Sequence, residues 1–207
     1  TVPHAATMAG VILVDDAGEN RIAIAPGALE HLTLDQGGRR AIQEADLLVI
    51  SLETPVEVAH AAIAAAREYD VRVLLNPAPA TALPSSLWQS VDILVPNQSE
   101  ARTLLDDDSI DDVQAARALA EIARCVVVLT RGADGALIAE PGREPRTVSA
   151  PAVTAVDTTG AGDAFVGVLA AELAAGVGLM PACERACAAA ATSVEHPGVI
   201  AGLPRNP

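Results

Sequence analysis

A run of small and polar residues opens an apolar helical pattern near the end of the chain, in AVDTTGAGDAFVGVLAAELAAG (residues 155–176). Gly160, Ala161 and Gly162 leave backbone N–H groups uncovered at the start of the expected helix, where a phosphoryl group in transfer can be held. Asp163 follows in the first turn, and a carboxylate there can accept the proton of an attacking hydroxyl. The same pattern suits a tight turn whose aspartate only complements the helix dipole. On its own, the motif leaves phosphoryl transfer and a structural turn equally open.

A second polar motif is PNQSEA (residues 96–101). Asn97 and Glu100 stand three apart on the first turn of an expected helix, so both can face one crevice. A carboxylate at that point suits Mg²⁺ bound through water near the phosphates of a nucleotide. Taken alone, the motif favours a simpler interpretation, in which Asn97 caps the helix and Glu100 is a first-turn acid.

A third motif is LTRGADG (residues 129–135). Thr130 ends an apolar strand pattern, and Gly132 with Gly135 allows the backbone to pass close to phosphates or to an adenine ring. A hairpin turn explains the same residues equally well.

Alternating strand and helix patterns from residue 46 onward predict the elements that position these motifs. Buried strands are expected at 46–51, 71–75, 91–96 and 125–130, and an antiparallel finish at 135–139 and 146–150. Helices are expected at 54–69, around residue 88, from 97, at 109–124, at 161–176 and at 180–195, with Thr54 and Ser109 as helix caps. This order predicts an α/β fold with a doubly wound, mostly parallel sheet flanked by helices. Ligands then bind at the carboxyl ends of the strands, where the three motifs meet.

An N-terminal hairpin precedes this region. Val11 to Val14 and Ile22 to Ala25 read as two strands, joined by a polar turn through Asp15 to Asn20.

Composition narrows the class of protein. The 207 residues allow one large α/β domain, or one domain with an appendage, and a formal charge of −14 argues against a nucleic-acid surface or an anionic membrane as partner. Cys125, Cys183 and Cys187 are odd in number and lack CxxC spacing, which indicates reduced core thiols and a cytoplasmic location. The longest apolar stretch is interrupted by Glu172, so no membrane span is expected.

Four motifs together, NPAPA, PNQSEA, LTRGADGAL and DTTGAGDAF in this order, resemble the ribokinase-like carbohydrate kinase family over residues 7–204. The hairpin GENRIAIAPGA and the stretch LETP strengthen the resemblance. It implies a ribokinase-like fold in which residues 1–30 form part of a lid and residues 31–207 form the nucleotide-binding α/β core. The first strands of the family's fold, which carry most sugar contacts, are expected to be absent from this chain.

The resemblance implies ATP-dependent phosphorylation of a sugar, D-ribose to D-ribose 5-phosphate. Asp163 is then the general base, and Gly160, Ala161 and Gly162 form the anion hole. Glu53 and Asp163 would contact the sugar, and Glu100 would organise Mg²⁺. ATP contacts are expected from Asn97, Thr130, Arg131, Gly132, Ala133, Asp134, Gly135, Gly162 and Cys187.

The family's activating monovalent cation, usually K⁺, is expected beside the anion hole, at Asp157, Thr159, Ser193, His196, Gly198 and Gly202. Two positions depart from the family. Cys187 stands where relatives often place a histidine or asparagine near the adenine, and Gly202 stands where a serine is common.

Two alternatives remain beside a ribose kinase. One is a kinase of another sugar or of a nucleoside, since the acceptor contacts lie mainly outside this chain. The other is a truncated, inactive nucleotide-binding or assembly protein. The expected partners are ATP and a small sugar, with a homodimer formed through the lid.

Overall fold

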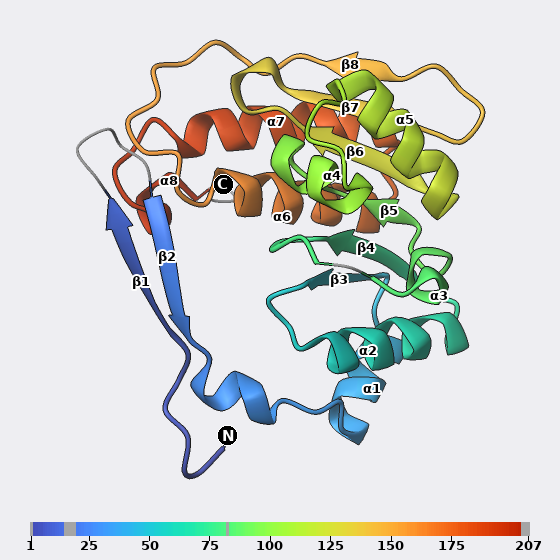
Figure 1. Ribbon diagram of the computed structural model, residues 1–207, viewed down its shortest axis with the longest axis vertical. Helices are drawn as coiled ribbons and strands as arrows, with labels where there is room; N and C mark the ends of the chain where they lie inside the picture. The colour runs from blue at the N-terminus through green and yellow to red at the C-terminus, as the bar shows by residue number, and fades with distance from the viewer. Residues whose placement is uncertain (1, 15–19, 82, 204–207) are drawn as a thin grey trace.

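A six-stranded mixed sheet forms the centre of the molecule (Figure 1). The computed structural model describes residues 2–14, 20–81 and 83–203. The first four strands are parallel and the last two are antiparallel to their neighbours. The strands lie side by side in chain order: β3 (Leu47–Ser51), β4 (Arg72–Asn76), β5 (Ile93–Leu94), β6 (Val126–Thr130), β7 (Ala136–Ala139) and β8 (Arg146–Val148).

Helices cover both faces of this sheet, as the sequence pattern predicted. One face carries α1 (Gln36–Gln43), α2 (Val56–Glu68), α3 (Ser85–Trp88), α4 (Gln98–Leu105) and α5 (Asp112–Ala123). The other carries α6 (Ala161–Ala174) and α7 (Leu179–Ser193).

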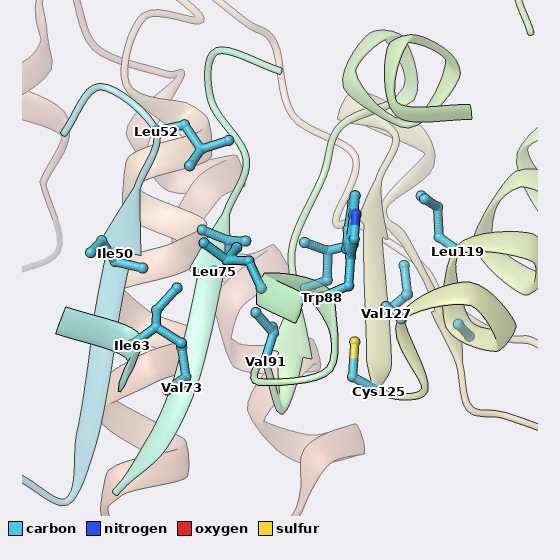
Figure 2. Packing of buried hydrophobic residues seen from close by; sticks show 14 of the residues in the cluster. Ile50, Leu52, Ile63, Val73, Leu75, Trp88, Val91, Leu119, Cys125 and Val127 are labelled. Carbon is cyan, nitrogen blue, oxygen red and sulfur yellow. The ribbon is translucent and has the colours of Figure 1, made fainter. Parts of the chain in front are cut away.

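Alternation along β4 shows how one strand serves both faces. Val73 and Leu75 pack with Ile63 and Trp88 in the core of the first face, whereas Leu74 packs beneath α6 and α7 (Figure 2). Successive side chains of a strand point to opposite faces, so a strand buried on both sides must be apolar throughout. The predicted α/β architecture is therefore confirmed.

Two of the expected helix caps are wrong. Pro55, not Thr54, occupies the N-cap position of α2, with φ −49° and ψ 133° and no side-chain cap bond. At α5 the cap is Asp111, whose carboxylate accepts from the Gln114 N–H, while the Ser109 hydroxyl donates to Asp107. Both helices start after the expected residue because the capping chemistry is shared among several neighbouring polar residues and only one can take the extended N-cap conformation.

The N-terminal hairpin forms as predicted and stands to one side of the sheet (Figure 1). β1 (Ala9–Val14) pairs antiparallel with β2 (Asn20–Ala25), from Ala9 opposite Ala25 to Val14 opposite Asn20. Of the expected turn through Asp15 to Asn20, residues 15–19 lie outside the described residues, and Asn20 is the first residue of β2 instead of part of a turn. The short 3₁₀ helix η1 (Gly27–His31) then leads to α1 and the sheet.

All three cysteines are buried and unpaired, as predicted. Burial raises the pKa of Cys125 and of Cys183 to about 12, and it also raises the pKa of Cys187. Among the described residues, no helix has the length and apolarity needed to cross a membrane.

Candidate functional site

The N-terminus of α6 is shaped by Gly160. Its φ of +78° is a left-handed conformation, and a Cβ there would lie 2.8 Å from Cγ1 of Val199. Ala161 N donates to Thr158 O at 3.3 Å, while the first-turn N–H groups of Gly162 and Asp163 have no acceptor within the helix. The turn therefore leads directly into a helix start with free N–H groups, which is the arrangement that binds an anion.

A cavity of about 470 Å³ lies on one side of this helix start. The end of β6 and the short 3₁₀ helix η2 (Gly132–Asp134) contribute Thr130, Gly132 and Ala133. Thr158, Ala161 and Gly162 line it near the start of α6, and Cys187, Ala190 and Val194 line it from α7. The volume suits a nucleoside-sized ligand.

Gly135 lets the β8–α6 segment close this cavity. Its φ is +82°, and a Cβ at this position would lie 2.0 Å from the carbonyl oxygen of Val148. Because any side chain would push the two segments apart, glycine at 135 keeps residues 150–153 against the cavity.

The structure gathers most, but not all, of the predicted ATP contacts at this cavity. Thr130, Gly132, Ala133, Gly135, Gly162 and Cys187 line it. Arg131 and Asp134 adjoin lining residues in the chain and Asn97 forms a bridge with Thr130, but none of the three lines the cavity. The Arg131 guanidinium donates to the Asp134 carbonyl oxygen at 3.0 Å, and its Nε is buried without a partner.

Sequence reasoning missed the apolar wall of the cavity, which comes from residues 150–153, Phe165, Ala190, Ala191 and Val194. The only signal for it was the spacing of Cys187, Ala190, Ala191 and Val194 on one side of α7. That spacing is equally typical of a core-facing helix, so it does not distinguish a cavity wall from packed core.

A second hollow lies on the other side of the α6 start, over the ends of β3 and β4. Asp163 and Gly167 line it from α6, and Ser51, Thr54 and Asn76 line it from the sheet side. Ser51 and Asn76 are register partners on adjacent strands, and Asn76 Nδ2 donates to Val95 O at 2.8 Å. Polar groups from three elements therefore converge beside the predicted base.

The sequence motifs gave no site role to Ser51 or to Asn76, which is the first residue of NPAPA, although a polar residue at the end of a buried strand is the available signal. Glu53, the predicted sugar contact, is exposed in the turn after β3 and lines neither hollow. Its contact with sugar stays a prediction.

The Asn97–Glu100 motif forms a reciprocal capping box. Asn97 Oδ1 accepts from the Glu100 N–H, and Glu100 Oε2 accepts from the Asn97 N–H, both at 2.8 Å. Burial raises the pKa of Glu100, and the bond from Asn97 N–H opposes that rise. Asn97 also forms a bridge with Thr130 at the end of β6. The helix-cap interpretation is correct locally, and the box lies next to the strand end that lines the cavity.

The residues predicted to hold a monovalent cation belong to two loops that are tied together. Asp157 Oδ1 accepts from the Thr159 N–H and Oδ2 from the Gly198 N–H, both at 2.9 Å. These bonds, with the Thr159 bond first, lower the pKa of Asp157. The N–H groups of Val156 and Asp157 both donate to the Val194 carbonyl oxygen.

The remaining cation candidates lie on either side of the loop around Gly198, with Ser193 as the last residue of α7 and Gly202 as the last residue of α8 (Val199–Gly202). Ser193 Oγ donates to Ala190 O at 2.8 Å, and the Ser193 carbonyl faces Gly202. His196 Nδ1 lies 3.4 Å from Thr192 O and its ring is exposed. Asp157, Thr159, Gly198, Ser193 and Gly202 are thus brought together, with His196 at the rim.

Comparison with known proteins shows the family and the fold of this chain. The model of the pfkB family of carbohydrate kinases matches residues 2–206. A ribokinase of Schizosaccharomyces pombe is 33% identical over 98% of this chain, which spans 66% of that protein. A deoxyribokinase of Salmonella typhi is 34% identical over 98% of the chain, which spans 68% of that protein. The structure of Arabidopsis thaliana ribokinase complexed with ribose and ATP superimposes with a TM-score of 0.88, at 27% identity, covering 97% of this chain and 67% of the other.

The chain therefore belongs to the pfkB family of carbohydrate kinases and has the ribokinase-like fold. It spans about two thirds of the length of these relatives.

Proposed function

We propose that this chain carries the nucleotide-binding and phosphoryl-transfer centre of an ATP-dependent ribokinase, converting D-ribose to D-ribose 5-phosphate. One observation carries the proposal. Two consecutive residues of α6 line different hollows, Gly162 the apolar cavity and Asp163 the polar hollow. ATP bound in the first hollow and a sugar hydroxyl in the second would meet at the free N–H groups of the helix start.

The transfer step follows from this placement. Asp163 accepts the proton of the primary hydroxyl, whose oxygen forms a bond to the γ-phosphorus of ATP while the bond to the β,γ-bridging oxygen breaks. ADP leaves with that bridging oxygen. The proposed anion hole of Gly160, Ala161 and Gly162 stabilises the charge on the transferring group, with the Gly162 N–H free to donate to it, and such charge stabilisation is most of what phosphoryl transfer needs from a protein.

Glu100 is the proposed contact to Mg²⁺. Within the described residues no three His, Cys, Asp or Glu side chains gather as a metal cage. A single half-buried carboxylate suits Mg²⁺, which keeps most of its waters and shares phosphate oxygens. When bound, the ion would neutralise charge on the phosphates, and Asn97 holds the Glu100 carboxylate in place for it.

The proposed K⁺ site is built around Asp157, whose carboxylate accepts hydrogen bonds from the backbone N–H groups of Thr159 and Gly198 and so joins the two segments. Carbonyl groups with one carboxylate are oxygen donors of the kind a monovalent cation takes. Val194 and Thr158 line the nucleotide cavity, so ordering these loops would order the cavity wall without any contact to substrate.

The proposed acceptor is ribose, because the S. pombe relative and the Arabidopsis structure are ribokinases and the latter holds ribose and ATP. Deoxyribose is the second candidate, because the S. typhi deoxyribokinase is equally similar. The remaining proposals follow the resemblance to the family. The β1–β2 hairpin, within residues 1–30, is part of a lid through which a homodimer forms, and residues 31–207 are the nucleotide-binding core. The protein is located in the cytoplasm, which the free cysteines support.

A coupled ADP-release assay tests the proposal, with D-ribose, 2-deoxy-D-ribose, D-fructose and adenosine as acceptors, with and without K⁺. We expect the highest kcat/KM for ribose and stimulation by K⁺. Highest activity on deoxyribose or adenosine would reassign the acceptor. ATP binding without turnover on any acceptor would favour the inactive nucleotide-binding alternative.

A further inference from the structure

The side chains that line the nucleotide cavity are almost all apolar. Alanine, valine, proline and phenylalanine make up its walls, together with glycines, and no charged side chain among the described residues contributes. Within the described parts of the chain, Thr130, Thr158 and Cys187 supply the only lining side-chain groups able to hydrogen bond.

The two threonines lie at the phosphate end. Thr158 lies three residues before the first residue of α6 and accepts the Ala161 N–H through its carbonyl, and Thr130 ends the strand that runs into the glycine turn. Because the helix N-terminus holds phosphate, this is the end where the phosphates of a bound nucleotide belong.

Cys187 lies at the opposite end. The Val194 carbonyl is bonded to Val156 and Asp157 near the helix start, and Cys187 is seven residues earlier on α7, about 10 Å along the helix axis. The base of a nucleotide whose phosphates contact α6 would therefore lie against Cys187, Ala190 and residues 150–153.

Cys187 is poorly suited to reading the edge of that base. Its thiol is a weak donor and a weak acceptor, so it tolerates either a 6-amino or a 6-oxo group. The side chain is only 3% exposed, and burial raises its pKa, which keeps it neutral. An apolar wall distinguishes ligands of similar shape weakly, whereas a site that places a fixed polar side chain against one group rejects the wrong ligand strongly.

From these contacts we propose that the cavity binds purine nucleotides by shape and apolar contact without reading the group at C6, so that 6-oxopurine nucleotides serve as phosphate donors alongside ATP. This inference rests on the proposed function only in placing a nucleotide in the cavity. It widens the donor from ATP to the class of purine nucleoside triphosphates.

Titration calorimetry with ADP and with inosine diphosphate tests the inference, because the two differ at C6. We expect their dissociation constants to agree within about tenfold. A preference of tenfold or more for ADP would overturn the inference, and would show that the cavity reads the group at C6.

Three variants locate the effect. Cys187→Ala should leave the ratio of the two dissociation constants unchanged, and a change of tenfold in that ratio would also overturn the inference. Cys183→Ala is the matched control, since Cys183 is buried one turn away on α7 and does not line the cavity. Ala190→Phe fills the base end and should weaken both ligands together.

Failure of the proposed function has a different signature. If neither diphosphate binds, or if Ala190→Phe leaves both affinities unchanged, the cavity is not the nucleotide site and both proposals fall. If ADP binds, Ala190→Phe abolishes that binding, and ADP binds much more tightly than inosine diphosphate, only the inference about the base falls.

Discussion

Gly202 packs directly onto the carbonyl group of Ser193. A Cβ at residue 202 would lie 2.2 Å from the Ser193 oxygen and 2.9 Å from its Cα and carbonyl carbon. The contacted atoms are backbone atoms and cannot rotate away as the end of a side chain can. Glycine at this position is therefore a packing requirement of this chain, and residue 202 has no side-chain oxygen to offer to the proposed cation site.

Replacing Gly202 by serine should therefore destabilise the protein and should not strengthen K⁺ activation. Overpacking against backbone is expected to lower the free energy of unfolding by about 1–3 kcal/mol. Thermal unfolding with and without KCl measures it. A Gly202→Ser protein with unchanged Tm and a lower K⁺ requirement would contradict the prediction.

Asp163→Asn should reduce turnover by about 100-fold or more while nucleotide affinity stays near that of the unchanged protein. The amide cannot take the hydroxyl proton, but it leaves the first-turn N–H groups in place. Asp163 lines the polar hollow and not the nucleotide cavity, which is why the two measurements should separate. The readouts are ADP release and ADP titration. Full turnover in the variant would exclude Asp163 as the base.

Gly160→Ala and Gly162→Ala should have opposite effects on stability. At 160 the φ is +78° and the new Cβ would meet Val199 at 2.8 Å, so we expect a loss of about 1–3 kcal/mol. At 162 a Cβ meets nothing within 4 Å, and alanine is favoured over glycine in a helix by about 0.5–1 kcal/mol. Urea unfolding measures both changes.

Nucleotide affinity adds a second readout for the same pair of variants. Gly162 lines the cavity, so its variant should bind ADP more weakly despite the added stability. Equal stability changes at 160 and 162 would show that the left-handed turn does not define the helix start.

Glu100→Gln should raise Tm at neutral pH and reduce Mg²⁺-dependent turnover. Burial raises the pKa of Glu100 above its ordinary value of 4.5, so ionisation begins to oppose folding as the pH rises past 4.5, and the loss of stability is complete above the folded pKa. Glutamine keeps an acceptor for the Asn97 N–H and removes the charge. The gain should disappear as the pH is lowered below about 4.5, which a series of melts across pH will reveal.

Asn97→Ala is the matched variant at the other end of the capping box. It removes the acceptor for the Glu100 N–H and should cost about 1 kcal/mol at every pH. A Glu100→Gln protein that loses stability at neutral pH as Asn97→Ala does would mean that the carboxylate's bonds outweigh its burial.

The hydrogen bonds by which Asp157 joins Thr159 to Gly198 should weaken in acid. The N–H bonds from Thr159 and Gly198 lower the pKa of Asp157, so the ionised carboxylate stabilises the folded state above the ordinary value of 3.8. That contribution is lost as the pH falls through the still lower folded pKa. Amide exchange protection at Thr159 and Gly198, followed by NMR from pH 6 downward, should decline in this window. Protection that is unchanged in Asp157→Asn would contradict the assignment.

Local chemistry explains what the sequence predicted well. The buried strands are continuous apolar runs, and Gly160 to Asp163 mark a turn and helix start through backbone conformation, which depends on adjacent residues. Helix caps were predicted less well, since Thr54 and Pro55, like Ser109 and Asp111, compete for one position.

By itself, the sequence determined the α/β class, the succession of strands and helices along the chain and the motif at the α6 start, because these follow from periodicity and from residues adjacent in the chain. Only the tertiary structure decided that Gly162 and Asp163 serve different hollows, that α7 and residues 150–153 form an apolar cavity wall, and that Asn76 lies beside Asp163 while Glu53 lines neither hollow. The reason is physical. Cavity walls are built by segments far apart in the chain, and an alanine or valine facing a cavity has the same sequence pattern as one packed in the core.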